Sequence, residues 1–154
     1  MASAVAKRRV LAISSGGGHW IQLQRLAPAF AEFDVAYASV FPDYADDVPG
    51  ARFHVVTDVT RRNIVKLAIL IPQLVALMLR ERPHAVITTG ALPGLAALAV
   101  ARLFRARTIW IDSIANVERL SSSGAQARLF ADEWVTQWPQ LASAGGPQYW
   151  GSVL

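Results

Sequence analysis

Short apolar runs rich in β-branched residues alternate along the chain with segments of helical periodicity. The strand-like runs are Arg9 to Ile13, Phe33 to Val40, Arg52 to Thr57, Ala85 to Thr88 and Thr108 to Ile111. Apolar residues recur at helical spacing from His19 to Phe30, from Arg61 to Arg82 and from Leu92 to Phe104. Parallel strands need crossover helices and are buried on both faces, so the alternation predicts an α/β, Rossmann-like parallel sheet with helices on both faces.

A glycine-rich turn follows the first predicted strand. Its sequence, SSGGGH from Ser14 to His19, leads into a predicted helix start, where N–H groups and the positive end of the helix dipole converge. It lacks the third glycine of a dinucleotide fingerprint, because Ile21 stands there, and it lacks the Lys-Ser/Thr pair of a Walker A loop. A plain tight turn is one interpretation. A phosphate-binding loop is favoured, because ordering three successive glycines costs backbone entropy that a plain turn would avoid.

His19 is the first ionisable side chain after this loop. A general base, a protonated phosphate ligand and an ordinary residue at a helix start are all consistent with its position. The nearest carboxylate that follows it, Glu32, is too far along the chain to be assigned as its partner. The local sequence therefore leaves its role open.

The segment from Ile64 to Leu79 has apolar side chains at thirteen of its sixteen positions. Sixteen helical residues reach only about 24 Å, and the run contains Lys66 and Pro72, so we expect it not to span a membrane. Pro72 is expected to kink or interrupt the helix. Burial between layers is one interpretation. The other is contact with a membrane surface, because a helix packed on a sheet needs only one apolar stripe and cations flank this one.

Polar groups also follow the fourth and fifth predicted strands. The segment Thr88 to Gly94, TTGALPG, fits a ligand loop or a structural turn equally well. After the next strand, Asp112, Ser113, Asn116 and Glu118 carry groups that can bind hydroxyl-rich ligands, while Asp112 or Ser113 as a helix cap is the simpler alternative.

Composition narrows the class of protein. The chain has 154 residues, of which 53% are hydrophobic, and 15 Lys and Arg stand against 11 Asp and Glu. It contains no cysteine, which excludes disulfides, thiolate metal sites and a cysteine nucleophile. The first apolar run is too short for a secretion signal, so a cytoplasmic location is expected. The positive balance favours an anionic ligand, yet no aromatic platform or motif points to nucleic acid.

Four ordered segments carry a resemblance to a known family. They are SSGGGHWIQLQRL, TTGALPGLAALAVARL, IWIDSIANVERLS and TQWP with GPQYWGSVL. Together they resemble the asparagine-linked glycosylation fourteen family, the membrane subunits of a two-protein UDP-N-acetylglucosamine transferase, and are closer still to its PssD-like and EpsE-like bacterial relatives in exopolysaccharide synthesis. A more distant similarity is to the N-terminal half of MurG.

The resemblance implies one half of a GT-B glycosyltransferase, with residues 1–154 as a single acceptor-side domain. A separate subunit would bind the UDP-sugar, and this chain would bind a polyprenyl-diphosphate-linked acceptor, with no cofactor and no metal. His19 and Glu118 would be catalytic. The residues implied to bind the acceptor or its diphosphate are Ser15, Gly16, Gly17, Gly18, Thr89, Gly90, Asp112 and Asn116.

The same resemblance implies peripheral attachment to the cytoplasmic face of the inner membrane. Many relatives begin with a hydrophobic anchor that this N-terminus lacks, so the attachment is assigned to the 64–79 helix and its flanks, with Arg62, Lys66, Leu70, Leu77 and Arg80 facing the membrane. Tyr149, Trp150 and Leu154 are implied to contact the partner subunit, with a buried structural role as the competing interpretation.

Two other functions remain as alternatives. The first is a non-catalytic scaffold that recruits a complete glycosyltransferase to the membrane. The second is a nucleotide-binding enzyme of another kind, which the failed dinucleotide fingerprint disfavours.

Overall fold

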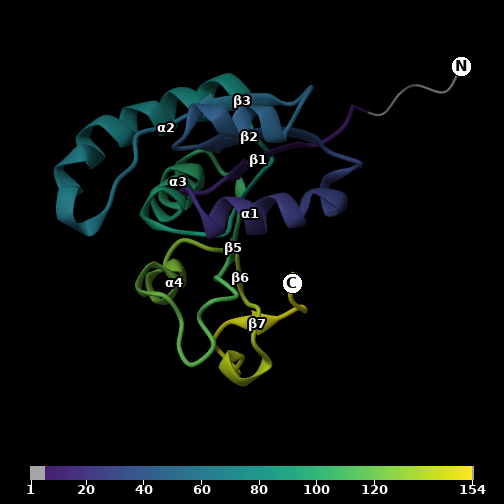
Figure 1. Ribbon diagram of the computed structural model, residues 1–154, viewed down its shortest axis with the longest axis vertical. Helices are drawn as coiled ribbons and strands as arrows, with labels where there is room; N and C mark the ends of the chain where they lie inside the picture. The colour runs from purple at the N-terminus through teal and green to yellow at the C-terminus, as the bar shows by residue number, and fades with distance from the viewer. Residues whose placement is uncertain (1–5, 154) are drawn as a thin grey trace, which may run out of the picture.

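A seven-stranded sheet forms the centre of the protein (Figure 1), in a computed structural model that describes residues 6–153. The strands are β1 (Arg9–Ile13), β2 (Asp34–Ser39), β3 (Arg52–Val55), β4 (Ala85–Thr88), β5 (Arg107–Ile111), β6 (Glu133–Thr136) and β7 (Gln148–Tyr149). They lie in the order β3-β2-β1-β4-β5-β6-β7, and every neighbouring pair is parallel. The order reverses between β1 and β4, which places the topological switch point beside the loop after β1.

Helices cover both faces of the sheet, as the alternation of apolar patterns predicts. The α-helices are α1 (Gly18–Arg25), α2 (Leu67–Glu81), α3 (Leu92–Leu103) and α4 (Ser122–Ala127), and the 3-10 helices are η1 (Ala27–Phe30), η2 (Pro42–Asp47), η3 (Arg61–Lys66) and η4 (Pro139–Leu141). On one face α1 buries Trp20 and Leu23. On the other face α2, α3 and α4 share a core with alternate residues of the strands, such as Leu11 and Ile13. The predicted fold class is confirmed.

The structure contains three elements that the sequence patterns did not predict: α4, β6 and β7. They are short, at six, four and two residues. In β6 the charged Glu133 leaves only the three residues Trp134, Val135 and Thr136 as a strand signal, which is too short to stand out in the sequence. This segment is a strand because its backbone pairs in parallel with β5, with Trp134 opposite Trp110.

The predicted long helix from Arg61 to Arg82 is divided into η3 and α2. The interruption lies at Asn63, where φ is −129° and ψ is 38°, and not at Pro72, which stands inside an α2 that runs without a break to Glu81. Thr60 and Asn63 form a capping box at the start of η3, with the Thr60 N–H donating to Asn63 Oδ1 at 2.6 Å. These side-chain hydrogen bonds compete with the backbone hydrogen bonds of a regular helix, which explains why the break lies at Asn63.

One side of α2 packs on the sheet, and this corrects two assignments. Leu70 and Leu77 were expected to face a membrane, but both are buried in the core with Leu74 and Met78. Within residues 6–153, η3 and α2 taken together, Arg61–Glu81, form the one helical stretch long and apolar enough to cross a membrane, with a mean hydropathy of 1.6. This stretch is longer than the 64–79 segment, so its length does not exclude a membrane span. The packing of one side of α2 on the sheet favours a helix that lies on a membrane surface.

Glu81 ends the buried side of α2 in a polar network with β2 and β3. Its carboxylate accepts from Arg52 Nε at 2.9 Å and contacts His54 Nε2 at 2.7 Å, while Arg52 also donates to Asp34 at 2.9 Å. Burial alone would raise the pKa of Glu81, but the hydrogen bonds from Arg52 and His54 outweigh it and hold the pKa below its ordinary value. The ionised form of Glu81 therefore stabilises the fold.

We expect Glu81→Gln to lower the free energy of unfolding at pH 7 by about 1 to 2 kcal/mol, a modest loss because Arg52 is half exposed. The pKa of Glu81 is lower in the folded state, so this contribution is present above about pH 4.3 and is lost as the pH falls further. Urea unfolding at pH 7 and pH 3 measures the difference between variant and wild type. A difference that persists at pH 3 would contradict the assignment, and the exposed Glu118→Gln is the control.

Candidate functional site

Two glycine loops meet at the carboxyl edge of the sheet, beside the switch point. The loop after β1 contains Ser15 and leads into α1, whose second residue is His19, and the loop after β4 contains Thr89 and Gly90. The Ser15 N–H donates to Gly90 O at 3.1 Å, and Thr89 Oγ1 donates to His19 O at 2.6 Å. One backbone hydrogen bond and one side-chain hydrogen bond thus hold the two segments together.

His19 is oriented by a carbonyl and not by a carboxylate. Its Nδ1 lies 2.8 Å from Thr89 O. A carbonyl can only accept a hydrogen bond, so Nδ1 carries the proton and Nε2 of the neutral ring keeps its lone pair. Nε2 makes no hydrogen bond with any residue from 6 to 153. The ring is therefore fixed in the tautomer that suits a general base or a phosphate contact.

Glycine is needed at Gly90 for space as well as for conformation. Its φ is +122°, and a Cβ placed there would lie 2.8 Å from the His19 ring. In the first loop, a Cβ on Gly16 would collide with the Phe41 ring. The two loops approach their neighbours closely because these positions carry no side chain.

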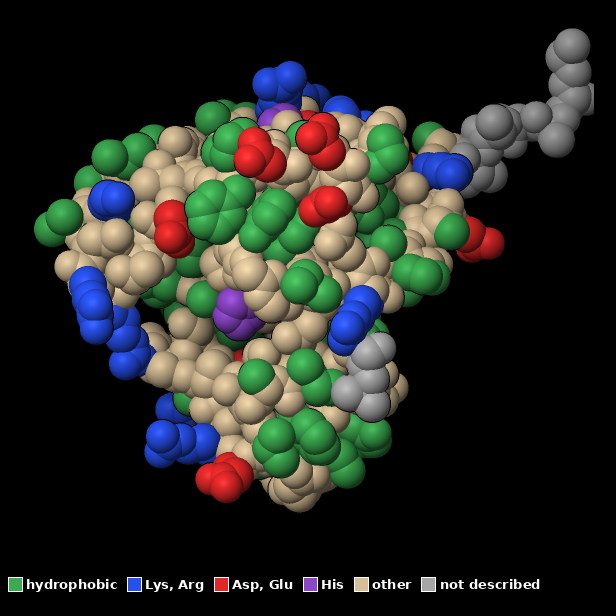
Figure 2. Space-filling view, in the orientation of Figure 1, with side chains coloured by type: hydrophobic (Ala, Val, Ile, Leu, Met, Phe, Trp, Pro, Cys, Tyr) green, Lys and Arg blue, Asp and Glu red, His purple; other side chains and the backbone are tan. Residues whose placement is uncertain are grey.

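A cleft of about 490 Å³ opens between these loops and the chain that follows β2 and β3. Its lining residues are Ser15, Gly16, Gly17, His19, Val40, Phe41, Asp58, Val59, Thr60, Arg61, Ala91, Leu92 and Ser123. The lining combines apolar side chains, among them Phe41 beside Gly16 of the glycine loop, with the side chains of His19 and Arg61. On the face seen in Figure 2, Lys and Arg side chains gather at the η3 end of α2.

Backbone donors of the glycine loop remain available to an anion. The Gly17 N–H donates to Tyr44 Oη at 2.9 Å, and Ile21 N–H begins the α1 ladder at Gly17 O. The N–H groups of Gly18, His19 and Trp20 have no acceptor within the described part of the chain. This is the geometry that binds phosphate at helix N-termini, and Arg61 adds a cation in the same cleft.

Asp112 has a structural position, which corrects its assignment to the acceptor. It is 1% exposed, Oδ1 accepts from Trp110 Nε1 and Ser121 Oγ, and Oδ2 accepts from Asn116 Nδ2 and Ser121 N–H. The expectation that Asp112 or Ser113 caps a helix is also wrong, because Ser121 caps α4 by accepting from Gly124 N–H at 2.8 Å. Asp112 holds the loop after β5 in place.

The structure brings together only part of the expected site. Ser15, Gly16, Gly17 and His19 line the cleft, and Gly18 lies exposed beside them. Thr89 and Gly90 are buried behind the His19 ring, Asn116 binds Asp112, and Glu118 is exposed and does not line the cleft. Tyr149 and Trp150 are exposed near the C-terminus, while Leu154 lies outside the described residues.

Sequence inspection missed Phe41, Asp58, Arg61 and Ser123 as cleft residues. Phe41 and Asp58 follow β2 and β3, and carboxyl ends of parallel strands gather at one edge, so the predicted topology contained a signal for them. Arg61 and Ser123 had no such signal, because their place depends on how η3 and α4 pack. Among residues 6–153, no group of three or more His, Asp or Glu side chains is placed to hold a metal ion.

Comparison with known families assigns the chain to one of them. Residues 48–153 match the family described as oligosaccharide biosynthesis protein Alg14 like, so the chain belongs to the Alg14-like family. Similar relatives include the protein named UDP-N-acetylglucosamine transferase subunit ALG14 of Eremothecium gossypii, 38% identical over 84 residues, which are 49% of this chain and 37% of that protein. The namesake from Yarrowia lipolytica is 31% identical over 86 residues, 52% of this chain and 40% of the relative. The chain spans well under half the length of these relatives.

Solved structures show the same fold. MurG of Acinetobacter baumannii superposes with a TM-score of 0.75 at 15% identity, over 92% of this chain and 45% of MurG. UDP-N-acetylglucosamine 2-epimerase of Rickettsia bellii gives a TM-score of 0.67 at 12% identity, over 87% of this chain and 40% of the epimerase. The resemblance to one half of a GT-B protein is confirmed at the level of fold.

Proposed function

We propose that this chain is the acceptor-side subunit of a split GT-B glycosyltransferase. It binds a polyprenyl-diphosphate-linked acceptor, and a separate subunit binds the UDP-sugar and completes the active site. The reaction belongs to exopolysaccharide, capsule or lipid-linked oligosaccharide synthesis. The observation that carries the proposal is the cleft, which combines free loop N–H groups, Arg61 and an oriented His19 in a member of the Alg14-like family.

The chemistry of the cleft supports a diphosphate-linked acceptor. The N–H groups at the start of α1 and the Arg61 guanidinium suit the diphosphate. His19 Nε2 then accepts the proton of the acceptor hydroxyl as that oxygen attacks the anomeric carbon of the donor sugar, and UDP departs from the partner subunit. The apolar wall at Phe41 suits the first carbons of the lipid.

The outer side of η3 and α2 is the proposed membrane surface. Val65 is 80% exposed and Ile69 is 55% exposed, and Arg62, Lys66 and Arg80 lie exposed around them. Arg61 belongs to the same η3 helix and lines the cleft, so this surface continues to the cleft mouth. Apolar side chains with basic neighbours are typical of a protein that lies on an anionic bilayer, here the cytoplasmic face of the inner membrane.

We expect the double substitution Val65→Glu with Ile69→Glu to reduce association with phosphatidylglycerol-containing vesicles by about tenfold or more, because two apolar side chains are lost from the contact. Both side chains are exposed, so stability is expected to change by less than about 0.5 kcal/mol. Vesicle co-sedimentation measures the effect. Leu103→Glu is the matched control, since Leu103 is also 80% exposed, and an equal loss in that variant would contradict the proposed surface.

The C-terminal segment is the proposed contact with the catalytic subunit. Tyr149 and Trp150 are 44% and 57% exposed beside the edge strand β7. Gln137 Oε1 accepts from Val153 N–H at 2.9 Å, and Gln137 Nε2 donates to Gln22 Oε1 at 2.7 Å. Gln22 lies on α1, one turn after His19, so a buried amide pair connects the proposed partner surface with the helix that starts at the cleft.

Purification from membranes followed by identification of the companion protein tests the assignment. We expect the isolated chain to bind membranes and to transfer almost no sugar from UDP-N-acetylglucosamine until the companion is added. Robust turnover by this chain alone would contradict a split enzyme. Full transfer by the companion alone on a soluble acceptor would favour the scaffold function.

A further inference from the structure

The 3-10 helix η2 packs against the first turn of α1 through the aromatic ring of Tyr44. This ring stacks on Trp20, with the ring centroids 5.0 Å apart and the ring planes 4° from parallel. Trp20 is 1% exposed, and its Nε1 donates to Oδ2 of Asp47, at the end of η2, at 2.8 Å. Two independent contacts therefore fix η2 on a buried tryptophan of α1.

The same tyrosine reaches the glycine loop with its hydroxyl. Tyr44 Oη accepts a hydrogen bond from the Gly17 N–H at 2.9 Å, and a Cβ placed on Gly16 would lie 3.4 Å from this oxygen. Gly17 directly precedes α1, has a φ of +66°, and is not held by a side-chain cap. Among residues 6–153, Tyr44 provides the one side-chain hydrogen bond to the backbone of the three successive glycines.

The contact with Tyr44 leaves the phosphate-binding groups of the loop available. It uses the N–H of Gly17, whereas the N–H groups of Gly18, His19 and Trp20 have no acceptor within the described part of the chain. Successive glycines have wide conformational freedom, and a loop that orders only when its ligand arrives weakens binding by the entropy it loses. A side chain that orders the loop beforehand removes part of that cost.

We propose that Tyr44 is a positioning residue for the acceptor diphosphate, because its hydroxyl and stacked ring hold the glycine loop with its free N–H groups ready for the ligand. The inference rests on the proposed function, which places the diphosphate at this loop. Tyr44 does not line the cleft, so it acts through Gly17 and not by touching the ligand. The acceptor diphosphate takes no part in bond making, so a looser loop is expected to weaken acceptor binding and to spare the chemical step.

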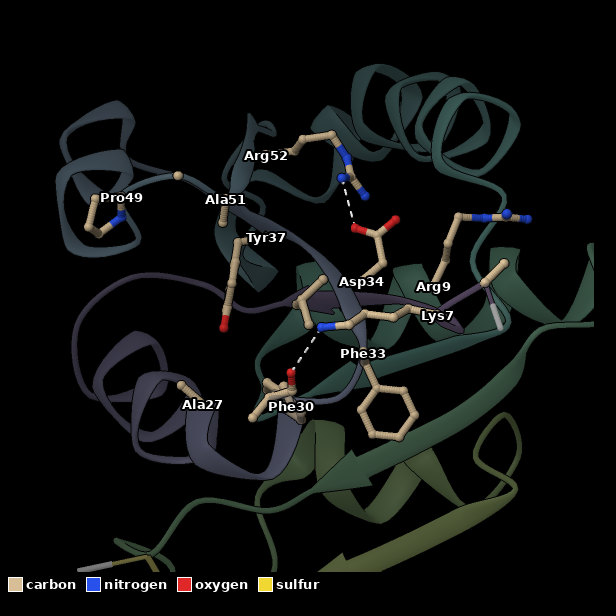
Figure 3. Close-up of a pocket in the computed structure, with 14 residues that line it drawn as sticks. Lys7, Arg9, Ala27, Phe30, Phe33, Asp34, Tyr37, Pro49, Ala51 and Arg52 are labelled. Atoms are coloured by element: carbon tan, nitrogen blue, oxygen red, sulfur yellow. Dashed lines mark hydrogen bonds and ion pairs between the residues drawn. The ribbon is translucent and has the colours of Figure 1, made fainter. Parts of the chain in front are cut away.

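Tyr37 offers a matched control on the same tryptophan. Its ring packs edge to face on Trp20, with the centroids 6.0 Å apart, and no residue from 6 to 153 forms a hydrogen bond with its hydroxyl. Figure 3 shows the Tyr37 side chain pointing from β2 toward Ala27, which lies beyond the C-terminal end of α1. Tyr37→Phe and Tyr44→Phe thus each remove one hydroxyl from a ring on Trp20, but only Tyr44→Phe removes a contact with the glycine loop.

Isothermal titration calorimetry of the full chain tests the effect on binding, with farnesyl diphosphate as the probe. We expect Tyr44→Phe to weaken binding about threefold to tenfold, the effect of one hydrogen bond, and Tyr37→Phe to bind as the wild type does. Farnesol, which lacks the diphosphate, is expected to distinguish none of the three proteins. An equal loss of farnesol binding in Tyr44→Phe would overturn the proposal, because it would place the effect on the apolar lining at Phe41.

Kinetics of the reconstituted pair distinguish positioning from a merely structural role. We expect Tyr44→Phe to raise the KM for the acceptor by the same factor as in calorimetry and to keep kcat within about twofold. A variant that only folded less well would lose active protein, which lowers the apparent kcat and leaves KM unchanged. That pattern would contradict the positioning role.

Hydrogen exchange in the ligand-free chain, measured by NMR, reports on the loop without any ligand. We expect the Gly17 amide to exchange severalfold faster in Tyr44→Phe and at the wild-type rate in Tyr37→Phe. Equal diphosphate binding by Tyr44→Phe and the wild type would overturn the positioning role alone, and so would equal exchange of Gly17. A wild-type chain that binds no farnesyl diphosphate would instead contradict the proposed diphosphate site, and with it the role of Tyr44.

Discussion

Replacing Asp112 by asparagine is expected to lower the free energy of unfolding by about 3 kcal/mol or more, the largest loss of stability expected from an isosteric substitution in this protein. All four hydrogen bonds to the carboxylate come from donors. The asparagine amide has one oxygen and one NH₂ group. In either orientation its NH₂ group therefore faces two of the surrounding donors and cannot accept their hydrogen bonds. The residue is 1% exposed, and water cannot relieve the conflict.

Urea unfolding measures this loss, and Asp46→Asn on the exposed η2 helix is the matched control, expected to change stability by less than about 0.5 kcal/mol. The same experiment separates two roles for Asp112. If the variant kept wild-type stability and lost only acceptor binding, Asp112 would contact the ligand directly, as its position after β5 first suggested. A loss of stability with unchanged acceptor binding would show that Asp112 holds the loop after β5 in place.

Replacing His19 by alanine is expected to reduce the transferase rate of the reconstituted pair by about 100-fold to 10,000-fold, the range for removal of a general base. The fixed Nδ1 contact with Thr89 O leaves Nε2 as the base. Partner binding is expected to remain, because Tyr149 and Trp150, the proposed partner contacts, do not line the cleft.

Glu118→Ala is the companion variant for this test, and it is expected to keep the rate within about twofold. Glu118 was expected to act with His19, but it is exposed and does not line the cleft. An unchanged rate in both variants with intact assembly would favour the scaffold function. A large loss in Glu118→Ala alone would mean that the partner subunit closes the cleft around the loop after β5.

Family membership and the proposed acceptor site rest on different parts of the chain. Family membership rests on residues 48–153, which exclude the glycine loop after β1. The fold similarity to MurG extends over 92% of the chain. The cleft lies where both parts meet, with His19 from one and Arg61 from the other. Variants at these two positions therefore test the two parts of the chain separately.

The sequence by itself determined the α/β class, the glycine loop and the position of His19. Alternating apolar periods fix which segments are strands and which are helices, because burial on a sheet demands those periods. A run such as Ala85 to Thr88 has this signal within itself, and the structure forms β4 there without change. Short elements with mixed composition, such as β6, have too little local signal and form only through pairing with a neighbour.

Tertiary structure alone decided which polar residues are open to a ligand and which are enclosed in the fold. Asp112 and His19 both follow strands in the sequence, yet packing buries one among four donors and leaves the other in an open cleft. The same is true of α2, where Leu70 and Ile69 are adjacent apolar residues with opposite surroundings. Local sequence sets the chemistry of a side chain, while its surroundings depend on segments brought together by the sheet, and those contacts between distant residues determine its role.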